Sequence, residues 1–67
     1  MFIRYIRVSA LEHDIVTMAE YASGKRFRIE SQRTGQFFST DDLDIAMKRF
    51  RQFASDASKR ERAFNNF

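Results

Sequence analysis

The chain has 67 residues, no cysteine, no proline and a formal net charge of +3 at pH 7. A chain of this length forms one domain with a small core, and without cysteine it has neither a disulfide nor a thiolate zinc site. Hydrophobic residues make up 43% of it, so globular folding is expected, and a homodimer would add buried area. We find no apolar run long enough to span a bilayer and no signal peptide. We therefore expect a cytoplasmic protein without a membrane partner.

Residues 2–8 combine β-branched and aromatic side chains with spaced arginines, which predicts a strand. Both faces of this strand mix apolar with charged side chains: Phe2, Ile6 and Val8 share one with Arg4, and Ile3 and Tyr5 share the other with Arg7. Two interpretations stay open. The segment is a central strand whose second face is half covered, or its second face meets a partner.

Residues 11–22 are predicted to form a helix. Ser9 and Glu12 have the spacing of a capping box, and Ser23-Gly24 is typical of a helix end. One helical face would carry Leu11, Ile15, Met18 and Ala22. The run of residues 15–18 is also compatible with a strand.

Residues 25–39 are predicted to form a β-hairpin. Phe27 and Ile29 alternate with Arg26 and Arg28, so one face is apolar and the other charged. Residues 32–35 fit a type I turn with glycine in the left-handed position. On the returning strand, one of the two adjacent phenylalanines at positions 37 and 38 should face the core and the other the opposite side.

A second helix follows the hairpin. Ser39 or Thr40 supplies the N-cap, and aspartates at positions 41, 42 and 44 suit the first turn. At 100° per residue, one arc collects Leu43, Ala46, Met47, Phe50, Phe53, Ala54 and Ala57, with Ile45 on the far side. We expect Phe27, Ile29, Phe50 and Phe53 to share one core cluster. Glu61 would interrupt the stripe, so we expect a domain of residues 1–58 and a basic, aromatic tail of residues 59–67.

The expected fold is therefore α+β, a two-layer β-α-β-β-α arrangement. A strand–helix–strand unit favours a right-handed crossover, with the first two strands parallel. The hairpin adds an antiparallel third strand. Both helices would cover one face of the three-stranded sheet and leave the other face open.

Catalytic constellations are missing from the sequence, and we expect a protein that is not an enzyme. The single histidine, His13, is expected on a helical surface, and no serine has the glycine context of a nucleophile elbow. The helix dipole already explains the aspartates at positions 41–44 without a metal. Gly24 and Gly35 fit a helix end and a turn rather than a phosphate loop. No cofactor or metal is expected.

A binding surface is the remaining candidate. Arginines beside an aromatic ring on an open sheet suit nucleic acid, because the cations meet phosphates and the ring stacks on a base. A charged face is also how a half-exposed sheet stays in solution, so both interpretations stay open. The candidate binding residues are Arg26, Arg28, Arg33, Lys25, Arg4, Phe37, Phe64 and Phe67, with Arg7 as an alternative to Arg4 and Phe38 to Phe37. Phe64 and Phe67 either stay in solvent or dock on this domain or on a second molecule.

The hairpin that leads into a capped helix, residues 26–53, resembles the arm-site DNA-binding domains of phage integrases, where strands precede a packed helix. The expected helix between the first two strands departs from that family. No residue role is transferred from it.

Two functions follow from these features. The first is a non-enzymatic module that docks through its basic sheet face on nucleic acid or on a nucleoprotein complex. The alternative is a small protein inhibitor or adaptor acting by protein–protein contact, of the kind phages encode against host defence systems. Exposed apolar groups such as Ile45 and Phe64 favour the alternative, because aromatic and arginine anchors dominate protein interfaces.

Overall fold

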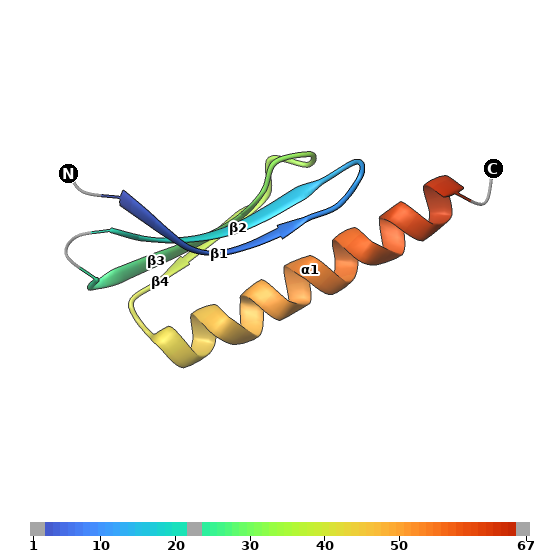
Figure 1. Ribbon diagram of the computed structural model, residues 1–67. Coiled ribbons are helices and arrows are strands. Elements are labelled where there is room, and N and C mark those ends of the chain that lie inside the picture. The colour runs from blue at the N-terminus through green and yellow to red at the C-terminus, as the bar shows by residue number, and fades with distance from the viewer. Residues whose placement is uncertain (1–2, 22–23, 66–67) are drawn as a thin grey trace.

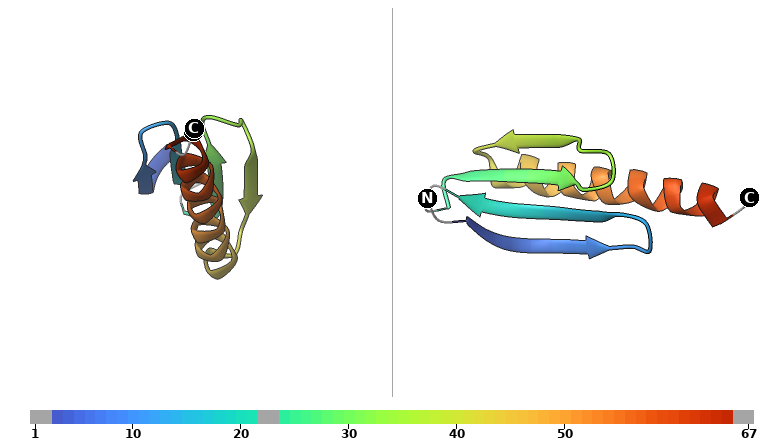
Figure 2. Two further views of the ribbon diagram at one scale, coloured as in Figure 1. Left: turned by 90° about the vertical axis from the view of Figure 1, so that its right-hand side faces the viewer. Right: turned by 90° about the horizontal axis from the view of Figure 1, so that it is seen from above.

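The computed structural model describes residues 3–21 and 24–65 (Figure 1). In chain order it contains strands β1 (Ile3–Ala10), β2 (Ile15–Tyr21), β3 (Arg26–Ser31) and β4 (Phe37–Thr40), followed by helix α1 (Leu43–Asn65). The strands form one antiparallel sheet in the order β1-β2-β3-β4. Helix α1 packs across β2, β3 and β4 on one face, and no described segment covers the other face (Figures 1 and 2).

The fold is α+β as expected, but the predicted β-α-β-β-α order is wrong. The sheet has four strands rather than three, and a single helix covers it rather than two. The predicted helix over residues 11–22 is a short loop followed by strand β2, which pairs antiparallel with β1. The expected parallel crossover is therefore replaced by a hairpin.

Strand β2 directs its side chains alternately to the two faces of the sheet. Val16 and Met18 are fully buried beneath the helix, while Ile15 on the other face is exposed. Three consecutive β-branched residues begin this strand, and such residues suit a pleated surface better than a helix. Gly24, expected at a helix end, instead has a φ of 81° in the turn before β3.

A β-bulge in β1 explains its imperfect alternation. Tyr5 is opposite Ala19 and Arg7 is opposite Met18, so the register shifts by one residue between them. Arg7 consequently lies on the helix side of the sheet, where it lines a shallow hollow with Phe50 and Arg51. The bulge also moves Val8 to the uncovered face.

The hairpin of β3 and β4 confirms the alternation read from the sequence. Phe27 and Ile29 are buried, and Phe38 packs against the core while Phe37 is exposed on the opposite face. Gly35 takes a φ of 74°, the left-handed conformation expected in the turn. Its amide donates to the Ser31 carbonyl oxygen over 2.9 Å.

Helix α1 begins later than expected. The carboxylate of Asp42, rather than the Ser39 or Thr40 hydroxyl, caps it by accepting from the amides of Asp44 and Ile45 at 2.9 and 3.2 Å. The Thr40 hydroxyl instead accepts from the Asp42 amide over 3.1 Å, which orients the cap.

The predicted apolar stripe of α1 faces the sheet, with one exception. Ala46 and Ala57 are fully buried, and Phe50 and Phe53 are partly buried. Leu43 is 49% exposed, so its assignment to the stripe is wrong. The core consists of Val16, Met18, Phe27, Ile29, Ala46 and Ala57, with Ile6, Leu11, Phe38, Met47, Phe50 and Phe53 packed around it. Of the expected cluster, Phe27 and Ile29 are buried in this core, while Phe50 and Phe53 pack against it and are only partly buried.

The helix is continuous across residue 58, where the sequence analysis divides the chain. It extends past the sheet at the end where β1 turns into β2 (Figure 2). At this end Arg60 and Glu61 contact the β1–β2 loop. The division into a domain of residues 1–58 and a tail of residues 59–67 stays a prediction.

Candidate functional site on the uncovered sheet face

Three rows of side chains cross the uncovered face of the sheet. In an antiparallel sheet, directly opposed residues point to the same side, so the register defines each row. The rows are Ile3, Tyr21 and Arg26; Tyr5, Ala19, Arg28 and Ser39; and Val8, Thr17, Glu30 and Phe37. We call these residues the open face. It changes from apolar on β1 to charged and aromatic on β3 and β4.

The β1 side of the open face is apolar and solvent-exposed. Ile3, Tyr5 and Val8 keep between 57% and 64% of their surface accessible. Ile15 adds a further partly exposed apolar side chain at the start of β2. A contiguous exposed apolar patch on a small domain is a typical feature of interaction surfaces.

A shallow concavity of about 310 Å³ lies at the centre of the open face. Thr17 and Ala19 form its floor, and only 7% and 8% of their surface is exposed although no element covers them. They are small residues between larger neighbours on the adjoining strands. The walls are formed by Ile3, Tyr5, Tyr21, Arg28 and Glu30, so one wall is aromatic and another carries charge.

The β3–β4 side of the open face combines arginine with an aromatic ring. The Arg28 guanidinium lies over the Phe37 ring, 4.2 Å from its centroid, which is a cation–π arrangement. Arg28 is also 3.7 Å from the Glu30 carboxylate. The two side chains of this ion pair are 44% and 40% exposed, so the pair contributes little stability and leaves part of the guanidinium accessible to a ligand.

Tyr21 joins the aromatic and basic parts of the face. A hydrogen bond with the Ser39 side chain and the nearby Arg26 and Arg28 guanidinium groups lower the pKa of the Tyr21 phenol below its ordinary value of 10.0, despite an opposing effect of burial. The contribution of the two arginines to this shift reflects a locally positive electrostatic potential. Such a potential attracts anionic groups.

Only part of the predicted binding set lies on this face. Arg26, Arg28 and Phe37 are together on it. Arg4 is on the helix side of the sheet, where its Nε is 2.9 Å from the Glu20 carboxylate. Arg7, the alternative to Arg4, is also on that side.

The other predicted binding residues are at the ends of the molecule or outside the described part. Lys25 is exposed in the β2–β3 turn. Arg33 is in the β3–β4 loop at the opposite end, where its Nη1 is 3.5 Å from the His13 carbonyl oxygen. Phe67 and the side chain of Phe64 lie outside the described residues.

Sequence reasoning missed the aromatic residues that complete the open face, Tyr5 and Tyr21. Tyr21 lies in the segment predicted to be a helix, and Tyr5 was grouped on one face with Arg7, which the bulge moves to the helix side. A signal was present nonetheless, because both faces of residues 2–8 are partly apolar, and one of the two interpretations was that the second face meets a partner.

Beyond the open face, the described residues contain one group that could hold a metal ion. Glu12, His13 and Glu61 each offer a ligand atom, and these atoms lie within 4.8 Å of one another. The aspartates at positions 41, 42 and 44 form no such group among the described residues.

In the part of the chain that the structure describes, no helix combines the length and apolarity needed to cross a membrane. In the comparisons with known proteins, no family model, no curated protein and no solved structure matches the chain.

Proposed function

We propose that the protein is a non-enzymatic binding module that docks through its open face on nucleic acid, with single-stranded segments as the preferred ligand. The observation that carries this proposal is the combination, on one uncovered face, of three aromatic side chains with two arginines. The aromatic residues are Tyr5, Tyr21 and Phe37, and the arginines are Arg26 and Arg28.

The geometry suits unpaired bases more than a duplex. Unstacked bases bind by stacking on exposed aromatic rings, while cations beside those rings meet the backbone phosphates. Tyr5 and Phe37 offer accessible rings, and Arg28 lies beside Phe37. A duplex presents its bases edge-on and would gain little from these rings.

The order of elements is compatible with this proposal. Strands β3 and β4 followed directly by α1 keep the strands-before-helix order for which residues 26–53 resemble the integrase arm-site domains, and no helix separates β1 from β2. The helix expected between the first two strands, which departed from that family, is therefore not there. The likeness concerns element order alone, and the cytoplasmic location expected from the sequence stays a prediction.

The proposal is tested by fluorescence anisotropy with a labelled 12-nucleotide oligo(dT) and with a duplex of equal length. We expect saturable binding of the single strand and weaker binding of the duplex. Phe37→Ala should weaken single-strand binding by about tenfold, because stacking contributes on the order of 1–3 kcal/mol per base. Ile45→Ala, an exposed apolar residue on α1, is the matched control and should change nothing.

Two results would reject the nucleic-acid function. One is the absence of saturable binding at 100 µM protein, and the other is equal affinity for single strand and duplex with no effect of Phe37→Ala. Ionic strength gives an independent criterion, because a contact with two phosphates of a single strand should weaken about sevenfold between 50 and 200 mM salt.

A protein partner is the second candidate, and the apolar β1 side of the open face favours it. Ile3, Tyr5 and Val8 are exposed side by side on an edge strand, and they offer a partner an apolar anchor. An inhibitor or adaptor that binds through these residues should show little dependence on salt. Loss of binding on Tyr5→Ala but not on charge reversal of Arg26 and Arg28 would favour this function.

A further inference from the structure

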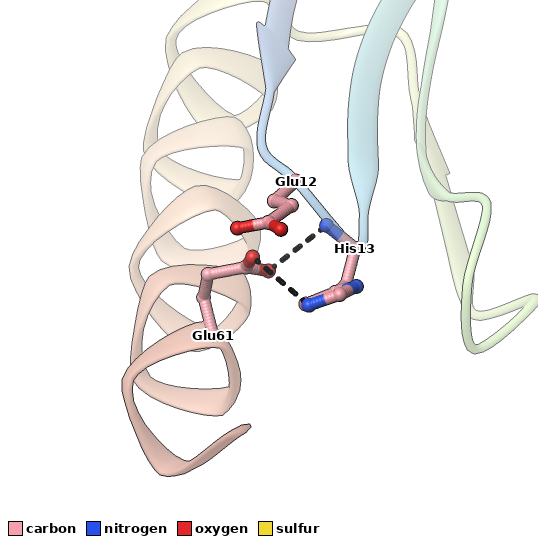
Figure 3. Close-up of side chains that lie close together, drawn as sticks. All are labelled: Glu12, His13 and Glu61. Carbon is pink, nitrogen blue, oxygen red and sulfur yellow. Dashed lines mark hydrogen bonds and ion pairs between the residues drawn. The ribbon is translucent and has the colours of Figure 1, made fainter. Parts of the chain in front are cut away.

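Three metal-ligating side chains meet where the β1–β2 loop contacts the last turns of α1. Glu12 and His13 come from the loop, and Glu61 reaches toward them from the helix (Figure 3). Candidate ligand atoms of the three residues lie within 4.8 Å of one another. The site is on the helix side of the molecule and shares no residue with the open face.

Both carboxylate oxygens of Glu61 lie close to His13, but only one of them accepts a hydrogen bond. Its Oε2 accepts a hydrogen bond from the His13 amide over 3.2 Å, while its Oε1 is buried without a hydrogen-bond partner. That oxygen is 3.9 Å from His13 Nε2, and only 12% of the Glu61 side chain is exposed. A buried carboxylate oxygen without a hydrogen bond is costly, and a cation bound between this oxygen and the His13 ring would offset that cost.

We propose that Glu12, His13 and Glu61 bind a divalent transition-metal ion of the zinc class. One imidazole nitrogen and two carboxylate oxygens form a ligand set typical of Zn²⁺, whereas Mg²⁺ and Ca²⁺ take oxygen ligands. Zinc bonds of about 2.0–2.2 Å place tetrahedral ligand atoms roughly 3.3 Å apart. Small side-chain rotations bring the present atoms to that spacing, and the fourth position is left to water.

The charges around the site determine the affinity for Zn²⁺ that we expect. Arg60, next to Glu61, is neutralised by Asp14, whose carboxylate is 2.9 Å from its Nη2. The Arg33 side chain approaches the His13 carbonyl oxygen and opposes a further cation. With three protein ligands and one nearby cation, we expect micromolar rather than nanomolar affinity.

A bound ion would connect the β1–β2 loop to the end of α1, which extends past the sheet. Because the site is assembled only in the folded chain, the ion should raise the melting temperature in proportion to the logarithm of its concentration. The ion thus acts as a clamp on this end of the molecule, independently of the nucleic-acid function.

The test is a Zn²⁺ titration of the untagged protein at pH 7.5, followed by calorimetry and by proton NMR. His13 is the only histidine in the sequence, so its ring signals report this site alone. We expect one equivalent of Zn²⁺ to bind, with the His13 ring signals shifting in step. Absence of binding at 1 mM Zn²⁺, or binding without a shift of those signals, would overturn the proposal.

Variants distinguish this site from general binding to surface carboxylates. His13→Gln and Glu61→Gln should each weaken Zn²⁺ binding by at least about tenfold, since loss of even an outer-shell partner costs that much. Glu30→Gln, an exposed carboxylate on the opposite face, is the matched control. If Glu61→Gln fails to fold, the loop variants His13→Gln and Glu12→Gln carry the test. Unchanged affinity in both loop variants would overturn the proposal.

Discussion

Asp14 is the residue that joins the most distant parts of the chain. Its carboxylate accepts from the Ser31 hydroxyl at 3.0 and 3.2 Å, from the Arg33 amide at 3.1 Å and from Arg60 Nη2 at 2.9 Å. Only 2% of this side chain is exposed. The carboxylate therefore connects the β1–β2 loop, the end of β3, the β3–β4 loop and α1.

Replacing Asp14 by asparagine should lower the free energy of unfolding by about 2–3 kcal/mol, because a charge-assisted, buried hydrogen-bond network loses its charge. Urea unfolding followed by circular dichroism measures this change. Asp41→Asn, on an exposed aspartate before the helix, is the control and should change the free energy by less than about 0.5 kcal/mol. Equal stabilities of the two variants would contradict the role given to Asp14.

The same residue predicts how stability depends on pH. Burial raises the pKa of Asp14, but the hydrogen bonds from Arg60, the Arg33 amide and Ser31 outweigh it and lower the pKa below its ordinary value of 3.8. A carboxyl group with a lowered folded-state pKa contributes stability above its unfolded-state pKa. This contribution should disappear as the pH falls below 3.8, and Asp14→Asn should show a smaller loss of stability in acid. Parallel pH profiles of the two proteins would contradict this assignment.

At the scale of elements, the start of α1 depends on one side chain. Asp42→Ala removes the acceptor for the amides of Asp44 and Ile45, and it should cost about 1 kcal/mol of stability. Thermal unfolding of Asp42→Ala beside Asp41→Ala measures this difference at equal change in charge. Equal losses in the two variants would show that helix-dipole charge, rather than the cap, stabilises this end.

The hairpin of β3 and β4 and the helix after it could be predicted from the sequence because local signals agree there. Alternation places Phe27 and Ile29, Gly35 supplies the turn, and a helical stripe follows. Residues 11–22 carry conflicting signals. A capping-box spacing and a helical apolar pattern compete with β-branched residues at positions 15–17, and pairing with both neighbouring strands decides in favour of β2.

The open face could be predicted only where the chain alternates regularly. Arg26, Arg28 and Phe37 were found because they lie in the regularly alternating hairpin. Tyr5 was missed because the sequence grouped it with the charged Arg7 on one face, whereas a bulge replaces Arg7 there by Val8, and bulges have no reliable sequence signal. Asp14 was missed because its partners come from segments 17 to 46 residues away in the chain.

At the scale of the whole molecule, one helix covers one face of a four-stranded sheet, and the molecule measures 43 × 20 × 16 Å. The two faces offer competing cationic surfaces. Arg26 and Arg28 are on the open face, whereas α1 carries six of the twelve lysines and arginines. The central claim is that the open face, and not the helix, binds the nucleic acid.

The most direct test compares two charge reversals of equal size by anisotropy with oligo(dT) at 50 mM salt. One variant carries Arg26→Glu and Arg28→Glu on the open face. The control carries Lys48→Glu and Lys59→Glu, which are exposed on α1. Arg60 is left unchanged because it pairs with Asp14. We predict that the open-face variant loses at least about tenfold in affinity, or 1.4 kcal/mol, while the helix variant loses less than about threefold. Loss of binding in the helix variant with full affinity in the open-face variant would contradict the claim.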